Sequence, residues 1–288
     1  MIDGHKVIAW TPYGRERTVS ILIKYMERDV QRGIVDEYRL YLNTDDNQER
    51  DRAYAHELAE QHDWITLQYR PEGIDLGNLP KQRYTGLAYR EMIDPNAVYI
   101  RLDDDVVYLH EDAVKNLVRA RLEMPAPTAV FPIIFNNAIV SHFLQLCGKV
   151  PMEWGEVKQY CMDPNGWANG PFAVKLHELL LDHIERGAVE DLYLYQDFPI
   201  APGTQFSVSC FASLGSMYAG LPHGPGVLVP DEEESFHTIH HPLATGAPNI
   251  LRGNAVVSHW SFFPQHAFLD SSSLLDRYRE LADKAVTA

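Results

Sequence analysis

The first half of the chain alternates short apolar segments with amphipathic ones, and this alternation constrains the fold more than any other sequence feature. Apolar segments of strand length lie at residues 6–10, 37–43, 64–69, 98–102 and 129–135. Segments with the apolar spacing of helices lie between them, at residues 19–30, 47–61, 80–92 and 111–122. Such alternation predicts an α/β protein with a mainly parallel sheet covered by helices on both faces.

The second half, from residue 141, is less regular. It contains helical patterns at residues 174–186 and 273–284, separated by Gly- and Pro-rich stretches such as 222–226. We therefore expect one continuous domain, in which the irregular half 141–288 continues the half 1–140 and adds loops to one side of a cleft.

Polar clusters follow three of the predicted strands. In an open sheet of this kind the ligand site lies beyond the carboxyl ends of the strands. These ends are expected at Thr11, Pro12, Tyr13, Gly14 and Arg15, at Asn43, Thr44 and Asp45, and at Asp103, Asp104 and Asp105. The sequence predicts that the three clusters meet at one edge of the sheet, as a nucleotide pocket requires.

The aspartate triplet is the strongest candidate for chemistry. Along an extended chain Asp103 and Asp105 point the same way. Neighbouring carboxylates repel each other unless a cation neutralises them, and Mg²⁺ or Mn²⁺ prefers such oxygen ligands. A solvated acidic turn is the simpler interpretation of a DDD sequence. Here, however, the triplet ends the apolar strand 98–102, where unpaired charges are costly.

The segment YIRLDDDVV, residues 99–107, resembles the DxD region of glycosyltransferases with the GT-A fold, particularly the family-2-like group. Residues 81–88 resemble the segment that precedes DxD, and Thr11–Pro12–Tyr13 resembles the nucleotide-base loop. The resemblance implies a Rossmann-like GT-A fold, with a nucleotide-sugar-binding half at 1–140 and an acceptor-side half at 141–288.

The same resemblance implies a set of ligands for the donor and its metal ion. Asp105 is the expected metal ligand, Asp103 contacts the ribose or the metal, and Asp104 can do either. The cofactor is Mn²⁺ or Mg²⁺. The expected donor-binding residues are Thr11, Pro12, Tyr13, Arg15, Asn43, Asp45, Lys81, Arg83, Asp103 and Asp104.

The acidic run PDEEESF, residues 230–236, resembles the xED motif, whose carboxylate is the catalytic base of inverting enzymes. When Phe236 is aligned with the apolar residue after that motif, Glu233 is the first candidate for the base. Glu232 is the second candidate and Asp231 the third. An inverting transferase needs such a base to take the proton of the acceptor hydroxyl. The alternatives are a solvated loop, a helix N-terminus favoured by the dipole, or a base at the literal ED sequence Glu190–Asp191.

Histidines and one tryptophan complete the candidates. His259 matches the late histidine that serves GT-A enzymes as a further metal ligand, although a lone histidine beside aromatic residues is more often part of a core. The spacing of His237, His240 and His241 fits no zinc template, so we expect loop residues near the acceptor. Trp167, beside Asn169 and Gly170, is expected either to stack on a sugar or to fill a buried turn.

Composition narrows the setting of the protein. The 40 acidic and 25 basic side chains give a net charge of −15, which disfavours a surface that wraps nucleic acid. The three cysteines lack any CxxC pattern, which favours a reducing compartment. The charged N-terminus does not resemble a signal peptide, and no apolar run reaches the ~18–20 residues of a membrane span. A cytoplasmic protein without a membrane span is therefore expected.

We therefore predict an inverting hexosyl- or pentosyltransferase that uses a UDP-sugar, with a GDP-sugar as the alternative donor. The acceptor is left open among a glycan, a protein and a modified nucleic-acid base. A nucleotidyltransferase is the nearest alternative, but the first strand is not followed by its Gly-rich loop. A phosphodiesterase lacks a second metal cluster, and a non-catalytic binding module would not need both acidic motifs. The absence of GxGxxG and GxxxxGK[ST] disfavours dinucleotide oxidoreductases and P-loop NTPases.

Overall fold

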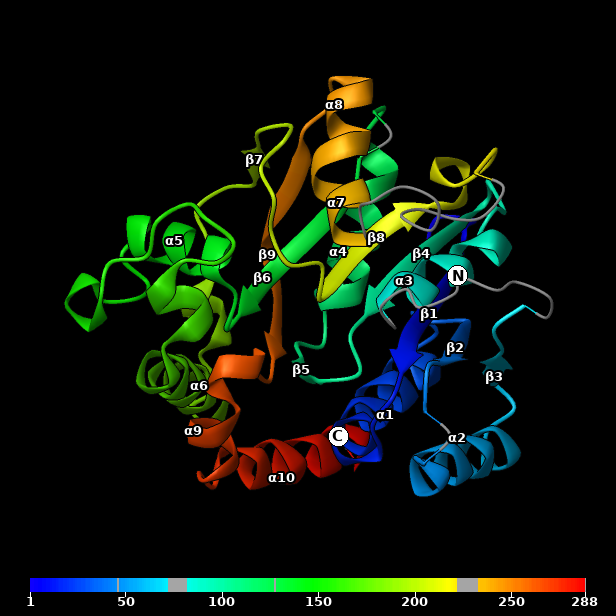
Figure 1. Cartoon of the computed structure of the whole chain (residues 1–288), viewed down its shortest axis with the longest axis horizontal. Helices are drawn as coiled ribbons and strands as arrows, with labels where there is room; N and C mark the ends of the chain where they lie inside the picture. The colour runs from blue at the N-terminus through cyan, green and yellow to red at the C-terminus, as the bar shows by residue number, and fades with distance from the viewer. Residues whose placement is uncertain (46, 72–81, 127, 222–232, 288) are drawn as a thin grey trace.

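A single mixed sheet organises the molecule (Figure 1). The structure is a computed structural model that describes residues 1–45, 47–71, 82–126, 128–221 and 233–287, without the side chains of residues 82, 83 and 287. The nine-stranded sheet has the order β3-β2-β1-β4-β8-β6-β9-β5, and β7 pairs with β9 beside this path. Helices flank the sheet, which confirms the predicted α/β class.

The N-terminal half forms the parallel part of the sheet. Strand β1 pairs with β2 and β4, and β2 pairs with β3, all in parallel. Every residue of β4 is buried, as is expected of a strand covered on both faces. The bounds are β1 Lys6–Tyr13, β2 Glu37–Leu42, β3 Ile65–Gln68 and β4 Ala97–Leu102. The intervening helices are α1 Glu16–Gln31, α2 Glu49–Gln61 and the short α3 Gln82–Thr85, which continues as a 3₁₀ turn over Gly86–Glu91.

The remaining strands interleave segments from both sides of residue 140. Strand β8 lies antiparallel between β4 and β6, and β9 runs parallel to β6 and antiparallel to β5 and β7. Thus the C-terminal half completes the sheet that the N-terminal half begins. The bounds are β5 Val106–Leu109, β6 Val130–Phe135, β7 Phe198–Ile200, β8 Cys210–Leu214 and β9 Asn249–His259.

The remaining helices pack on this sheet and on one another. The C-terminal helix α10 lies beside α1, the first helix of the chain (Figure 1). The bounds are α4 Ala113–Glu123, α5 Ala138–Leu146, α6 Gly170–Glu185, α7 Glu233–Ser235, α8 His241–Thr245, α9 His266–Asp270 and α10 Leu274–Thr287. Within the described part of the chain, none of these helices combines the length and apolar character that a bilayer crossing requires.

Some sequence expectations are corrected. Thr11, Pro12 and Tyr13 were expected in a loop, but they belong to β1 and pair with Leu40, Tyr41 and Leu42 of β2. The side chains of Thr11 and Tyr13 stay buried, as those of the preceding strand residues are, and the strand continues with them to Tyr13. The expected helix 80–92 is described only from residue 82, mostly as a 3₁₀ turn.

Candidate functional site

A cleft of about 790 Å³ opens at the carboxyl ends of β1, β2 and β4. This is the edge at which the sequence predicted the ligand site. The N-terminal half contributes Pro12, Gly14, Arg15, Asn43, Asp45, Asn47, Gln48, Thr85, Arg101, Asp103, Asp104 and Asp105. The C-terminal half contributes Ser207, Val208, Ser209, Glu233, Glu234, His259 and Phe262.

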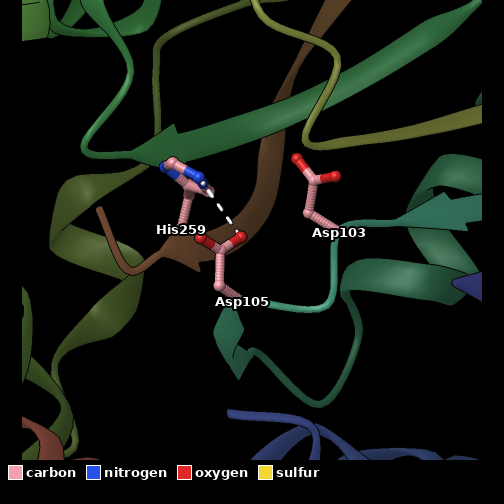
Figure 2. Close-up of side chains that lie close together, drawn as sticks. All are labelled: Asp103, Asp105 and His259. Carbon is pink, nitrogen blue, oxygen red and sulfur yellow. Dashed lines mark ion pairs between the residues drawn. The ribbon is translucent and has the colours of Figure 1, made fainter. Parts of the chain in front are cut away.

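Three potential metal ligands meet in this cleft (Figure 2). Asp103 directly follows β4, Asp105 directly precedes β5, and His259 ends β9. Because β5 and β9 pair antiparallel with Val106 opposite His259, the ladder itself brings the histidine to the aspartates. One ligand atom from each residue lies within 4.8 Å of the other two. In Figure 2 the Asp105 carboxylate faces the imidazole of His259. His259 Nε2 lies 3.3 Å from Asp105 Oδ1.

The charges of the cluster are coupled to each other. Burial alone would raise the pKa of the Asp105 carboxyl, but His259 and Arg15 outweigh burial and hold that pKa well below its usual range. Conversely, burial would lower the pKa of His259, but the Asp105 charge raises it above its ordinary value. Burial raises the pKa of Asp103 despite the neighbouring Arg101. The electrostatics of the cluster therefore favour a positive charge beside Asp105.

The donor set fits a divalent cation. Two carboxylates and one imidazole suit Mn²⁺, which accepts both oxygen and nitrogen ligands. The His259 ring packs against Phe262 with the ring centroids 4.7 Å apart. Its Nδ1 has no hydrogen-bond partner among the described residues, so the ring contact and Asp105 set its orientation. The histidine thus presents Nε2, rather than Nδ1, to the aspartates.

Asp104 fastens the loop after β1 to the cluster. The backbone N–H of Gly14 donates to its Oδ2 at 3.0 Å, and Arg15 Nε donates to its Oδ1 at 3.1 Å. Burial raises the Asp104 pKa to about 6, although Arg15 lowers it in part. Arg15 also reaches Asp105, with Nη2 3.2 Å from Oδ2. Asp104 therefore bonds residues of the loop after β1, whereas Asp103 and Asp105 belong to the candidate metal cluster.

A buried ion pair connects the acidic run to the cluster. Arg101, inside β4, donates from Nε to Glu233 Oε1 at 2.9 Å and from Nη2 to Oε2 at 3.0 Å. Its Nη1 lies 2.6 Å from Asp103 Oδ1. The hydroxyl of Tyr89 donates to Glu233 as well. Burial would raise the Glu233 pKa, but Arg101 outweighs it and lowers that pKa.

The expected donor-binding residues separate into two groups. Arg15, Asn43, Asp45 and Pro12 line the cleft. Thr11 and Tyr13 are fully buried on the opposite side of β1, where the Thr11 hydroxyl bonds Tyr38 and the Tyr13 hydroxyl donates to a backbone carbonyl of α2. The expected residues Lys81, Glu232 and Asp231 and the side chain of Arg83 lie outside the described residues.

Other expectations change as well. His237 is not an exposed loop residue but is buried in a π-helical turn, with its Nδ1 2.8 Å from the carbonyl oxygen of Glu233. Burial lowers its pKa to about 4. The alternative ED pair, Glu190–Asp191, lies in a 3₁₀ turn, and Glu190 lines a different cavity beside α1 and α10.

Several cleft residues were missed at the sequence level. Arg101 had a signal, because a lone arginine inside an apolar strand needs a buried acidic partner. Glu234 lines the cleft and accepts a hydrogen bond from Gln205 at 2.8 Å, but nothing in the sequence separates it from its acidic neighbours. Phe262 and Ser207–Ser209 lie in irregular segments where no periodicity indicates their direction.

Comparison with known proteins supports the fold. No protein-family model matches the chain. No curated protein matches it either. The mannosyltransferase PcManGT from Pyrobaculum calidifontis, solved with GDP-Man and Mn²⁺, aligns over 98% of this chain and 72% of its own, at 14% identity and a TM-score of 0.52. GalNAc-T7, solved with UDP, GalNAc and Mn²⁺, aligns over 98% of this chain at 10% identity and a TM-score of 0.52.

The extent of these alignments differs. The chain spans 48% of GalNAc-T7, about half of its length. A 4-diphosphocytidyl-2C-methyl-D-erythritol synthase from Anaerococcus prevotii aligns over 45% of this chain and 56% of its own, at 17% identity and a TM-score of 0.32. This likeness is too partial to define a common fold. The two fuller alignments show the GT-A fold that the sequence resemblance implied. Membership of the family-2-like group stays a prediction.

Proposed function

We propose that the protein is a metal-dependent glycosyltransferase that moves a sugar from a nucleoside-diphosphate donor to a hydroxyl group of an acceptor. The observation that supports this most is the Asp103–Asp105–His259 cluster, which lies in the cleft at the carboxyl edge of a GT-A sheet. In this proposal residues 1–140 bind the nucleotide-sugar, and residues 141–288 provide the acceptor side and the base.

In this proposal Asp105, Asp103 and His259 hold Mn²⁺, with Mg²⁺ as the alternative. The imidazole favours Mn²⁺, and the two fuller structural neighbours were both solved with it. When bound, the metal neutralises the negative charge that develops on the departing diphosphate. Arg15 adds a fixed positive charge beside Asp105, and Asn43 and Asp45 line the part of the cleft assigned to the nucleotide. A UDP-sugar is the first donor in this proposal, and a GDP-sugar is the alternative.

An inverting reaction needs a base that can accept the proton of the acceptor hydroxyl. Glu233 is the first candidate from sequence, but Arg101 and Tyr89 already occupy its oxygens, so we assign it the task of positioning Arg101. Its neighbour Glu234 lines the cleft and is the described residue of this run that we assign as base. Asp231 and Glu232 stay candidates outside the described residues.

A thermal-shift panel tests the proposal. UDP, GDP, CDP and dTDP, each with Mn²⁺, Mg²⁺ or EDTA, are added to the wild-type protein and to Asp105→Asn. A ligand that binds only the native state raises Tm by mass action. We expect one nucleotide to raise Tm with Mn²⁺ but not with EDTA, and Asp105→Asn to lose this response. Asp276→Asn, an exposed change on α10, is the matched control and keeps the response.

The opposite result is equally clear. If no nucleotide raises the Tm of the wild-type protein with either metal, the donor site does not exist as proposed. If Asp105→Asn responds like the wild-type protein, nucleotide binds without the cluster, and the role of Asp105 is wrong.

A further inference from the structure

Two aromatic side chains, Phe262 and Trp167, form a pair that adjoins the candidate metal ligand His259 and lies outside the core. Phe262 lines the cleft and packs against the ring of the candidate ligand His259. Trp167, from a segment almost one hundred residues earlier, approaches the same Phe262 with ring centroids 6.4 Å apart and planes at 41°. Burial therefore accounts for neither of these two rings in full.

The neighbouring Trp260 shows what an aromatic residue of the core looks like in this region. Trp260, two residues before Phe262, is only 2% exposed, and its ring contacts the buried His177. Trp167, by contrast, is only partly buried and belongs to no helix or strand of the sheet layers. The sequence left two explanations for Trp167, stacking on a sugar or filling a buried turn. Its partial exposure favours stacking on a sugar.

The segment that presents Trp167 is built for rigidity. It is a five-residue π-helical turn, Pro164–Ala168, a rare conformation that is often found at functional sites. The buried Asp163 carboxylate accepts hydrogen bonds from the backbone N–H groups of Asn165 at 2.9 Å and Gly166 at 3.1 Å. A Cβ on Gly166 would lie 2.6 Å from the Cα of Ala138, so the turn is pressed against the start of α5. Trp167 is thus held in place by the surrounding backbone.

We propose that Trp167 and Phe262 form the acceptor subsite and that they take a neutral sugar ring. This inference rests on the proposed function. Aromatic faces attract the partly positive C–H groups on the flat side of a pyranose, in the same way that they attract the edges of other rings. A sugar on this platform adjoins His259 through Phe262, which places its hydroxyl groups at the cleft.

The charges of the cleft and of the whole chain favour some acceptor classes over others. The cleft is lined by the carboxylates of Asp45, Asp103, Asp104, Asp105, Glu233 and Glu234, against the cations of Arg15 and Arg101. The whole chain has a net charge of −15. A polyanionic acceptor such as nucleic acid would be repelled by such a surface, whereas a neutral saccharide would not. The platform therefore favours a glycan among the three acceptor classes that the sequence left open.

Saturation-transfer NMR tests the subsite with defined probes. Maltose, cellobiose, lactose and N,N′-diacetylchitobiose are added separately to the full chain, with and without UDP or GDP and Mn²⁺. A threonine-containing peptide and an oligothymidylate are the competing acceptor classes. The variants are Trp167→Ala and Trp167→Phe. Tyr195→Ala is the matched control, because Tyr195 is 80% exposed and does not line the cleft.

We expect at least one disaccharide to receive saturation at its ring C–H protons. Trp167→Ala should weaken its affinity about tenfold, the scale of one lost ring contact. Trp167→Phe should recover most of that loss, and Tyr195→Ala should have no effect. Binding of nucleotide with Mn²⁺ should stay within about twofold in every variant, because the subsite is separate from the donor site.

Three results would overturn the subsite. The first is that no disaccharide binds the wild-type protein. The second is that Trp167→Ala, which deletes the ring, binds the disaccharide as well as the wild-type protein does. The third is that the peptide or the oligothymidylate, rather than a saccharide, depends on these rings. Failure of nucleotide binding in the same samples would refute the proposed function instead, so the two failures are distinguishable.

Discussion

Replacing Glu233 by Gln separates a structural role of this residue from a catalytic one. The change keeps the shape of the side chain but removes the charge that faces Arg101 in a buried pair. Removing one member of a buried ion pair costs roughly 3–5 kcal/mol. Arg101 keeps Asp103 as a second partner, with Nη1 2.6 Å from Oδ1. We therefore expect a loss near the lower end of that range, about 3 kcal/mol.

Urea unfolding at pH 7.5 measures this loss, with ΔG extrapolated linearly to water. Glu178→Gln, an exposed change on α6, is the matched control and should leave ΔG unchanged. The pH dependence has a definite sign. Because the Glu233 pKa is lowered in the folded state, its contribution is fully present above the unfolded pKa of ~4.3 and is lost as the pH falls through the folded pKa. The gap between the two proteins should therefore close in acid.

A different outcome would refute the reasoning. If Glu233→Gln is as stable as the wild-type protein but loses a thousandfold or more of its turnover, Glu233 is the base and not the partner that positions Arg101. A stability loss that persists unchanged below the folded pKa of Glu233 would show that packing, rather than charge, holds the residue in place.

Further predictions concern the turn, the buried histidines and the base. Gly166→Ala should destabilise the fold by roughly 1–3 kcal/mol in urea, because the new Cβ would lie 2.6 Å from the Ala138 Cα. Burial lowers the pKa values of His177 and His237 to about 4, so the unfolded chain binds more protons and stability falls between pH 6.5 and 4. Unfolding midpoints measured across that range would show no slope if both histidines were protonated in the fold. Glu234→Gln should abolish turnover at nearly unchanged ΔG, and full activity would exclude it as base.

The sequence was sufficient for the part of the fold that depends on local pattern. Apart from β5 and the 3₁₀ turn Gly86–Glu91, the helices and strands of the first half follow from apolar periodicity. The resemblance to DxD enzymes identified the three residues that the structure brings together as a possible metal site. His259 could be matched by order along the chain, but its contact with Asp105 depends on the pairing of β9 with β5. That pairing joins segments about 150 residues apart, and no local pattern encodes it.

The errors have physical causes of the same kind. Proline and the polar Thr11 suggested that β1 ends at residue 10, but the neighbouring β2 pairs with the chain up to Tyr13 and buries it. Arg101 was missed as a cleft residue because its partner Glu233 is more than 130 residues away in sequence. In both cases tertiary pairing decided what composition left open.

Anomalous diffraction from crystals grown with Mn²⁺ and the nucleotide selected by the thermal-shift panel tests the central claim most directly. The account predicts one Mn²⁺ peak within about 2.0–2.3 Å of oxygen atoms of Asp105 or Asp103 and of His259 Nε2, with the diphosphate completing the coordination. A nucleotide bound in the cleft with no Mn²⁺ at Asp103, Asp105 and His259, or Mn²⁺ there with the nucleotide bound elsewhere, would contradict it.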